Sequence, residues 1–391
     1  MEQNLYRYNP WWETDFKADN DISRPQIFEI LKADLNSRQI TFLTGLRRVG
    51  KTTLMKQVVR YLIAEMKIES KYIFYVSLDD YLLASKSILE IIEEYRKLHK
   101  ISFQEKIYLF LDEVTYQKDF ELQLKNIYDQ QNAKVFASSS SASLLKSKKA
   151  FLTGRNTVIE VLPLDFEEYL QFKKISIKKS DRNLLEKYFE EFMQTGGMPE
   201  YVLTGNIEYL KELVDDIIQK DIAAFYGVRD VQVLKDFFLL LMERSGKVFS
   251  INKMAKILAI SPDSAKRYLQ MFTNSYLIFL LPRFGKTNER LMSAKKIYAA
   301  DLGVRSYFTG FRDKGSLFEN YVYLKIRKLK PSYVYQDNNE IDFLTEKKIL
   351  IEVKYNSEMT ESQKILFEQI AAKEKILIKD IFDLEKLNGL S

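Results

Sequence analysis

Short apolar runs alternate with amphipathic stretches along the first 164 residues of the chain. The amphipathic stretches repeat apolar residues with a spacing near 3.6, which predicts helices, whereas the short apolar runs between them predict strands. Strands that alternate with helices are typical of a parallel sheet with crossover helices. We therefore predict an α/β domain at 1–164, with an N-terminal arm and strands at 39–44, 71–79, 106–114, 133–139 and 156–164.

The remaining pattern predicts three further regions. Residues 165–230 are helical except at the turn TGGMPEY, whose paired glycines supply backbone freedom that a Cβ would forbid, and we interpret them as a helical lid. Residues 231–285 contain a helix, a turn, a helix and an apolar strand, which is the order of a winged helix-turn-helix. Residues 286–391 mix short strands with helices, so we predict a second α/β domain there.

Composition narrows the chemistry that the chain can perform. The 391 residues include no Cys and one His, His99, which excludes disulfides, thiolate nucleophiles, iron–sulfur clusters and His-rich metal sites. Carboxylates, hydroxyls, lysines, arginines and a bound cofactor remain available. We find neither a secretory signal nor an apolar run near the ~20 residues that span a bilayer, so we expect a cytoplasmic protein without membrane contact.

The segment after the first predicted strand matches a phosphate-binding loop. It reads GLRRVGKT at 45–52 and fits the pattern G-x-x-x-x-G-K-[ST] at every fixed position. Glycines let backbone N–H groups surround phosphate oxygens, Lys51 reaches the β and γ phosphates, and the Thr52 hydroxyl binds Mg²⁺. We therefore predict ATP and Mg²⁺ as cofactors. The predicted binding residues are Gly45, Arg48, Gly50, Lys51, Thr52 and Thr53.

Two adjacent carboxylates, Asp112 and Glu113, follow a later apolar strand. A buried strand would deliver them to the phosphate edge of the sheet, where Asp112 can hold the Mg²⁺ shell and Glu113 can orient or deprotonate the attacking water. One predicted strand separates this pair from the phosphate loop. That arrangement favours motor and remodelling ATPases over simple kinases.

Ser138 and Arg155 are further candidates, each with an alternative interpretation. Ser138 ends the next predicted strand, where it could contact the γ-phosphate or the water, or simply belong to a Ser-rich turn. Arg155, in LTGR, could neutralise transition-state charge in a neighbouring subunit, or be an ordinary surface arginine.

These motifs resemble the prokaryotic AAA-type ATPases that carry a C-terminal domain of unknown function. The matching segments are YRYNPWWE (6–13), LTGLRRVGKTTLM (43–55), YLFLDEV (108–114), SSASLL (140–145), LTGR (152–155), LPLDFEEYL (162–170), TGGMPEY (195–201) and KIYAADLG (296–303). The resemblance implies an ATPase core, a helical lid, a winged helix and a nuclease-like C-terminal domain. It also implies roles for Lys51, Thr52, Asp112, Glu113 and Arg155 and, by analogy, a homo-oligomer such as a hexamer. One departure is the pair Ser138-Ser139, where the group usually has Thr-Gly.

The predicted winged helix is basic. Residues 217–285 hold ten Lys and Arg against five Asp and Glu, which accounts for +5 of the net +6 of the chain. Lys266 and Arg267 lie on its second helix, and Lys253 and Lys256 lie nearby. Phosphate contacts from such a patch would give sequence-tolerant, salt-dependent binding of duplex or branched DNA. The alternative is a basic surface that packs against protein.

A second group of carboxylates lies near the C-terminus. Asp342 precedes Glu352 by ten residues, Lys354 follows Glu352 by two, and Glu319 lies upstream on a helical stretch. A hairpin would bring Asp342 and Glu352 to one metal, with Lys354 on the same strand face. This spacing resembles the D…ExK pattern of restriction-endonuclease-like folds, although ordinary two-sided strands also alternate charged residues.

The sequence thus supports three functional hypotheses. The first is an Mg²⁺-dependent ATPase that binds, and remodels or translocates on, DNA. The second is an ATP-regulated, metal-dependent DNA nuclease that uses the C-terminal carboxylates. The third is a nucleotide-dependent switch or scaffold that binds a protein partner.

Overall fold

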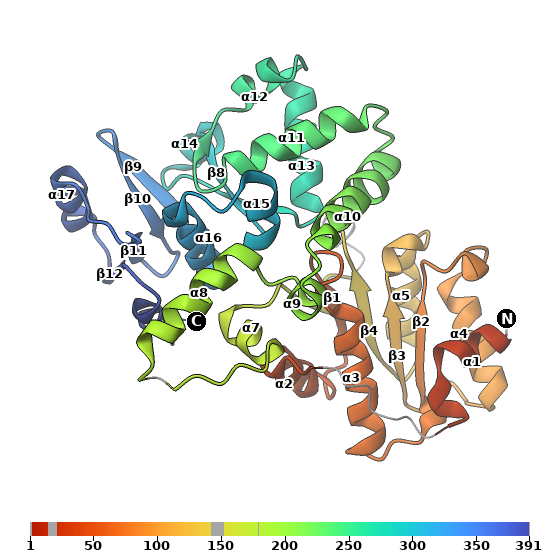
Figure 1. The fold of residues 1–391 in the computed structure, drawn as a ribbon. Helices are drawn as coiled ribbons and strands as arrows, with labels where there is room; N and C mark the ends of the chain where they lie inside the picture. Colours follow the sequence, from red (N-terminus) through yellow and green to blue (C-terminus); the bar gives the residue numbers. More distant parts are fainter. Residues whose placement is uncertain (1, 15–21, 142–151, 179, 391) are drawn as a thin grey trace. The chain divides into compact units, whose positions relative to one another are not determined.

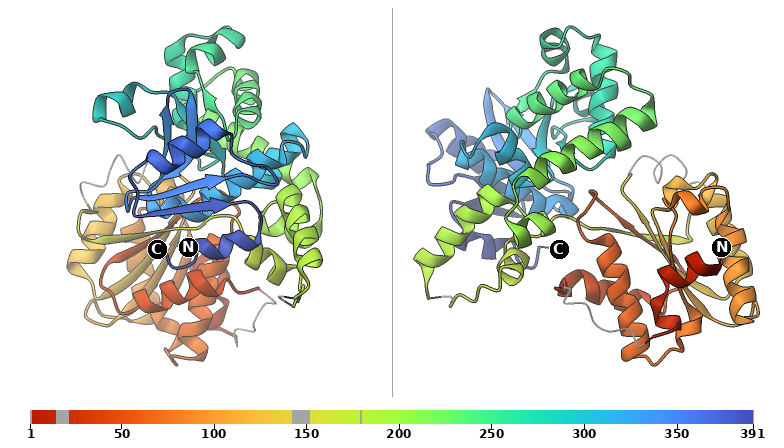
Figure 2. Two further views of the ribbon diagram at one scale, coloured as in Figure 1. Left: turned by 90° about the vertical axis from the view of Figure 1, so that its left-hand side faces the viewer. Right: turned by 45° about the vertical axis from the view of Figure 1, so that its right-hand side comes forward.

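The computed structural model describes residues 2–14, 22–141, 152–178 and 180–390. The chain forms two compact units, Met1–Leu162 and Pro163–Ser391 (Figure 1 and Figure 2). In the described part of the chain, no helix has both the length and the apolar character that a bilayer crossing requires.

The first unit is built on a five-stranded parallel sheet with the order β2-β3-β4-β1-β5. The predicted α/β fold with a parallel sheet is therefore confirmed. The strands are mostly buried, which explains their near-continuous apolar sequences. Their bounds are Ile40–Thr44 (β1), Ile73–Ser77 (β2), Ile107–Asp112 (β3), Ala133–Ser139 (β4) and Asn156–Glu160 (β5).

Helices cover both faces of this sheet (Figure 1). The chain crosses from β1 to the far edge at β2 and then returns through β3 and β4, so right-handed crossovers place the first connecting helix on one face and the next two on the other. Accordingly α2 packs with α3, and α4 packs with α1 and α5. The bounds are Glu2–Tyr8 (α1), Pro25–Asp34 (α2), Lys51–Ala64 (α3), Ile88–His99 (α4) and Phe120–Gln130 (α5).

The N-terminal arm covers the open edge of the sheet at β2. The buried Asn9 side chain donates to the carbonyl oxygen of Tyr75 (2.9 Å) and accepts from its N–H (2.7 Å), as a neighbouring strand would. The indoles of Trp11 and Trp12 both donate to the carbonyl oxygen of Ile73 at 3.1 Å. These contacts pair backbone groups that would otherwise form an unprotected sheet edge.

The second unit begins with helices and continues through two sheets. Helix α10 runs on into a π-helical segment, Ile217–Ala224, of a kind that is uncommon in proteins. The helical bounds before the first sheet are Phe166–Phe172 (α7), Arg182–Thr195 (α8), Pro199–Thr204 (α9), Glu208–Asp216 (α10) and Val231–Glu243 (α11).

An antiparallel three-stranded sheet with the order β6-β8-β7 follows α11. Ser250 and Ser261 cap helices α12 and α13, and Pro262 occupies the first turn of α13. The boundary predicted after residue 285 falls inside this sheet, because β8 pairs with both β6 and β7 and closes the hairpin around α14. The bounds are Val248–Phe249 (β6), Ile251–Ile257 (α12), Pro262–Asn274 (α13), Ile278–Leu281 (β7), Thr287–Met292 (α14) and Lys295–Ala299 (β8).

The last sheet has four strands in the order β12-β11-β10-β9. It is tied to the three-stranded sheet, because Tyr333 donates its N–H to the carbonyl oxygen of Pro282 (3.0 Å) and accepts from the N–H of Phe284 (2.7 Å). The bounds are Leu302–Thr309 (α15), Lys314–Ile326 (α16), Ser332–Gln336 (β9), Asn339–Leu344 (β10), Ile349–Val353 (β11), Glu361–Gln369 (α17) and Glu374–Ile378 (β12).

Two distant glycine motifs of the second unit contact each other through their backbones. A Cβ on Gly196 would lie 2.3 Å from the N of Gly303, and a Cβ on Gly303 would lie 1.9 Å from the carbonyl oxygen of Thr195. The buried carboxylate of Asp301 accepts N–H bonds from Gly197 (2.7 Å) and Val304 (2.9 Å). The glycines of TGGMPEY thus provide close approach as well as turn freedom.

Candidate functional site

The phosphate loop connects β1 to α3. Arg48 and Gly50 have positive φ angles of 63° and 95°, which turn the backbone sharply before the helix begins at Lys51. The Lys51 side chain is only 5% exposed, and its ammonium donates to the carbonyl oxygens of Gly45 (3.1 Å) and Leu46 (3.0 Å). The loop, the helix N-terminus and the lysine predicted for phosphate binding therefore lie together.

Asp112, at the end of β3, lies beside the start of α3. Its Oδ2 accepts from the hydroxyl of Thr52 at 2.6 Å and from that of Tyr75 at 2.8 Å, and its Oδ1 accepts from the hydroxyl of Ser138. Burial, reinforced by the charge of Asp112, raises the pKa of Tyr75 well above its ordinary value, so this hydroxyl remains a donor. Three neighbouring elements thus fix one carboxylate.

Glu113 follows with a positive φ of 51°, which turns it away from the strand direction. Its N–H donates to the Ser138 hydroxyl at 2.9 Å, so Ser138 links the two predicted acids. Its carboxylate Oε2 accepts from the N–H (3.2 Å) and the hydroxyl (3.1 Å) of Ser140. Residues 142–145 of the segment SSASLL lie outside the described residues.

Sequence reasoning missed three residues around this site. Tyr75 is one aromatic residue in an apolar strand, and Ser140 is one of several consecutive serines, so neither carries a distinguishing signal. Arg24 is buried and donates to the carbonyl oxygens of Val49 (3.2 Å) and Leu162 (2.9 Å). Only the contacts made across the fold identify these three.

The four C-terminal candidates converge on one cluster. Asp342 N–H donates to Glu352 Oε2 at 3.0 Å, and Lys354 Nζ lies 2.7 Å from Glu352 Oε1. Burial, followed by the charge of Asp342, raises the pKa of both Glu319 and Glu352. The sequence missed two members, Lys296 and Glu340, and the Lys296 ammonium contacts Glu319, Glu340 and Asp342. Within the described ranges, no group of three or more acidic or His side chains is arranged to hold a metal ion.

Comparison with known proteins gives family models for two parts of the chain and relatives that cover most of it. Residues 37–170 match the family model described as an AAA domain, and residues 186–315 match a domain of unknown function. An uncharacterized protein of Methanocaldococcus jannaschii, MJ1544, is 31% identical over 376 residues, which cover 90% of this chain and 81% of that protein. The chain belongs to the same family as MJ1544. An uncharacterized protein of Haemophilus influenzae is 27% identical over 83% of this chain and 84% of its own length.

Solved structures give weaker likenesses. The Aeropyrum pernix ORC1 protein, solved in complex with DNA, is 13% identical with a TM-score of 0.34 and covers 78% of this chain and 96% of its own. AMPPCP-bound DnaA from Aquifex aeolicus is 16% identical with a TM-score of 0.30 and covers 66% of this chain and 89% of its own. The assignment of an AAA domain therefore rests on the family match and on the geometry of the phosphate loop.

Arg155 of the AAA domain lies away from its own phosphate loop. It immediately precedes β5, which runs parallel to β1. It therefore lies near the N-terminal ends of these strands, whereas the phosphate loop follows the C-terminal end of β1. Its guanidinium donates to Asp129 at 3.1 Å. Within one AAA domain this arginine therefore lies at the opposite end of the strands from the phosphate loop.

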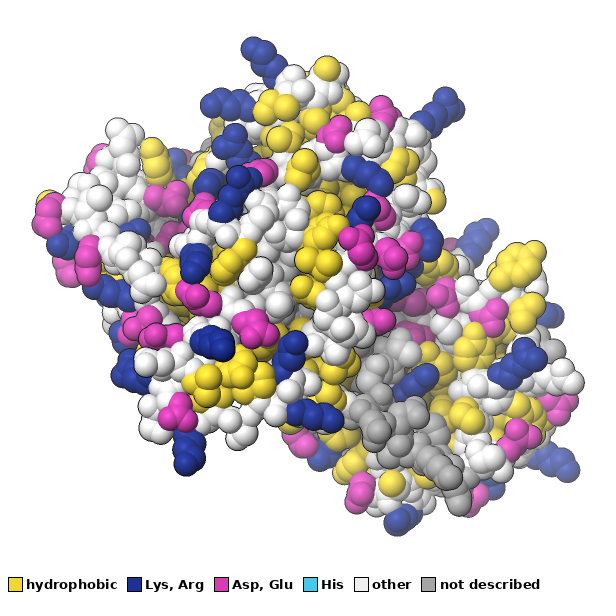
Figure 3. All heavy atoms as spheres, viewed as in Figure 1, with side chains coloured by type: hydrophobic (Ala, Val, Ile, Leu, Met, Phe, Trp, Pro, Cys, Tyr) yellow, Lys and Arg dark blue, Asp and Glu magenta, His cyan; other side chains and the backbone are white. Residues whose placement is uncertain are grey.

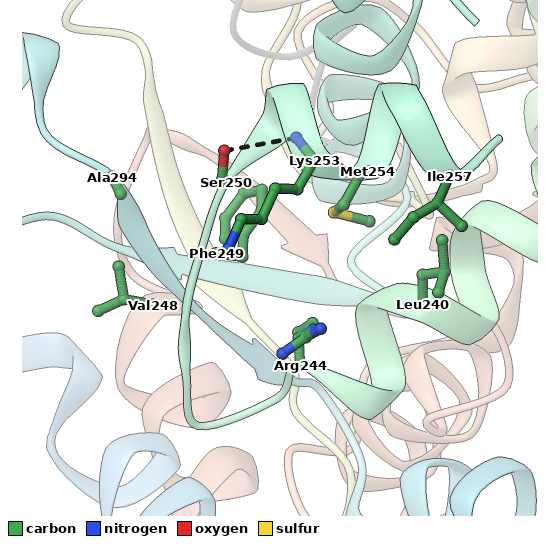
Figure 4. Close-up of a pocket in the computed structure, with 9 residues that line it drawn as sticks. All are labelled: Leu240, Arg244, Val248, Phe249, Ser250, Lys253, Met254, Ile257 and Ala294. Carbon is green, nitrogen blue, oxygen red and sulfur yellow. Dashed lines mark hydrogen bonds between the residues drawn. The ribbon is translucent and has the colours of Figure 1, made fainter. Parts of the chain in front are cut away.

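The predicted DNA-binding residues of the second unit are all exposed: Lys253, Lys256, Lys266 and Arg267. Lys and Arg side chains project from the surface around α11 and α12, with hydrophobic side chains exposed among them (Figure 3). Lys253 and Arg244 line a pocket of about 220 Å³ between α11 and α12, beside apolar side chains such as Val248 and Ile257 (Figure 4). This surface therefore offers both positive charge and apolar contact.

Proposed function

We propose that the AAA domain binds ATP with Mg²⁺ and hydrolyses it. The observation that carries this proposal is the 2.6 Å hydrogen bond between Thr52 and Asp112, because it brings a hydroxyl from the first turn of α3 and a strand carboxylate to one point. Both are the hard oxygen ligands that Mg²⁺ prefers, so these two residues would hold the ion. Bound Mg²⁺ would neutralise charge on the β and γ phosphates, and Lys51 would contact the same phosphates.

Glu113 is the proposed residue that orients or deprotonates the attacking water. Ser140 donates two hydrogen bonds to Oε2 of this carboxylate, which leaves Oε1 able to accept from the water. Ser138 would keep the two acids aligned through its hydrogen bonds to Asp112 and to the N–H of Glu113. Arg155 would act on the nucleotide of a neighbouring subunit in a homo-oligomer.

Metal removal tests the enzymatic part of the proposal. We expect steady-state phosphate release from ATP in the presence of Mg²⁺ and its loss when EDTA chelates the ion. Thr52 and Asp112 are ligands for the ion, and they cannot replace the positive charge that it supplies to the phosphates. The chelated protein should recover its rate when Mg²⁺ is returned. Equal rates with and without divalent ions would contradict the proposal.

We further propose that residues 231–299 form a winged helix that binds duplex or branched DNA. Support comes from the order of elements, α11-β6-α12-α13-β7-α14-β8, and from the exposed face of α13 that carries Lys266, Arg267 and Gln270. Lys253 and Lys256 extend the charge along α12. Such a surface would contact phosphates and would tolerate different base sequences.

Charge reversal on α13 tests DNA binding. We expect K266E/R267E to weaken duplex binding by roughly 10–100-fold at low salt and to reduce the slope of log affinity against log salt by about 2, one for each phosphate that the variant no longer neutralises. Fluorescence anisotropy at several salt concentrations measures both quantities for duplex and four-way DNA. The matched control is K173E/K174E, an adjacent pair of exposed lysines at the end of α7. If both variants lost affinity equally, the loss would follow from net charge and would contradict a DNA-binding site on α13.

An ATP hydrolysis rate that rises when DNA is added would show that DNA binding and ATP hydrolysis are coupled in this protein. Stimulation that disappears in K266E/R267E would connect α13 to the ATP cycle. Hydrolysis that ignores DNA while DNA still binds would instead favour the nucleotide-dependent switch or scaffold.

A further inference from the structure

We propose that the ammonium of Lys296 permanently fills the cation position among Glu319, Glu340 and Asp342. The C-terminal carboxylate cluster would then be a metal-independent ion-pair network, and the sheet that carries it would be a module that does not cut DNA. Lys296 lies on β8, outside the strands and helix that supply the acids.

The contacts of Lys296 resemble those of a bound cation. Its Nζ lies 2.7 Å from Glu319 Oε1, 2.7 Å from Glu340 Oε1 and 3.3 Å from Asp342 Oδ1, and its side chain is only 1% exposed. Three acids from two elements therefore point at one ammonium. A divalent ion would have to displace this ammonium to bind the same oxygens.

The remaining oxygens of the two central acids are also engaged. Asp342 Oδ2 accepts from the N–H of Val353 at 3.0 Å, and Glu352 Oε2 accepts from the N–H of Asp342 at 3.0 Å. Glu352 Oε1 lies 2.7 Å from Lys354 Nζ. Each carboxylate oxygen of Asp342 and Glu352 thus lies within 3.3 Å of an ammonium or an N–H group of this chain, and a metal ion would have to compete with these groups.

Lys296 is held firmly in this position. Strand β8 lies between β6 and β7, which fixes its backbone. Tyr298, two residues further along the same strand face, donates to the same Glu319 oxygen at 2.5 Å. Burial alone lowers the pKa of Lys296, but the charges of Glu319, Asp342 and Glu340 outweigh burial and raise it well above its ordinary value. The side chain therefore remains a cation.

Removing this lysine would leave three acids without a cation, which is costly in a buried site. The network also joins the three-stranded sheet, through β8, to α16 and to β10 of the four-stranded sheet. The cluster therefore serves the assembly of the second unit, a role that requires no metal and does not depend on DNA binding.

Manganese binding to the nucleotide-free, full-length protein tests the inference. Electron paramagnetic resonance reports free Mn²⁺ directly. We expect wild type and D342N to leave the same Mn²⁺ fraction free, and K296M to acquire a one-to-one site and an unfolding temperature that rises with Mn²⁺. A one-to-one Mn²⁺ site in wild type that disappears in D342N would overturn the inference.

Two further measurements keep the test decisive if K296M does not fold. K296R retains the charge, so it should fold and leave Mn²⁺ free as wild type does. Wild type incubated with supercoiled or four-way DNA and Mn²⁺ should leave the DNA intact. Cleavage by wild type that is abolished in both D342N and K354A would show a working metal site and refute the role given to Lys296.

Discussion

Replacing Glu113 by Gln is expected to slow ATP turnover by roughly 10²–10⁴-fold while leaving ATP bound. The amide keeps the size of the side chain and its ability to bond Ser140, but it cannot accept a proton from water. The contacts that would hold ATP and Mg²⁺ come from Lys51, Thr52 and Asp112, and this change leaves them in place. Phosphate release measures turnover, and a fluorescent ATP analogue measures binding.

The matched control is Glu93→Gln, which makes the same chemical change at an exposed position on α4. Its turnover should equal that of wild type. A Glu113→Gln protein that hydrolyses ATP at the wild-type rate would remove Glu113 from the reaction. A variant that no longer binds ATP would show a structural role instead.

Asp301→Ala is expected to lower the free energy of unfolding of the second unit by about 2–6 kcal/mol, because each of two buried N–H groups left without a partner costs about 1–3 kcal/mol. The Asp301 carboxylate accepts from the N–H groups of Gly197 and Val304, and alanine would leave both unsatisfied. Chemical denaturation measures the decrease. The control is Asp181→Ala, at an exposed residue whose side chain makes no helix-cap hydrogen bond, and it should change stability little.

The same carboxylate predicts a pH dependence of stability. Burial raises the pKa of Asp301 from 3.8 to about 6, although its backbone hydrogen bonds act in the opposite direction. Between these values the folded protein keeps a proton that the unfolded chain releases, so this group makes the protein less stable as pH rises, by about 3 kcal/mol in total. Asp301→Asn cannot titrate. The difference in unfolding free energy between wild type and Asp301→Asn should therefore change across pH 4–6, and a constant difference would contradict the assignment.

The first unit could be predicted well because each of its signals is local. A strand, a glycine loop and a helix start are consecutive in sequence, so residues 39–64 specify their own geometry. The β6-β8-β7 sheet was harder to delimit. Its last strand follows the short helix α14, which begins at the change of pattern near residue 286.

In the candidate sites, too, residues close together in sequence could be predicted and residues far apart in sequence could not. The spacing of Asp342, Glu352 and Lys354 indicated a shared cluster, and the structure brings them together with Glu319. Lys296 begins the matching segment KIYAADLG, but it is far from these acids in sequence, so no spacing rule could reveal that a lysine occupies the centre. Packing between elements supplies that information.

The Arg24 guanidinium connects the phosphate loop to the last residue of the first unit through hydrogen bonds. One side chain binds Val49, inside the loop, and Leu162, the last residue of the unit. Gly45 adds a second connection, because a Cβ there would lie 2.1 Å from the carbonyl oxygen of Val161. A triphosphate that shifts the loop would therefore also move residues 161–162, at the end of the first unit.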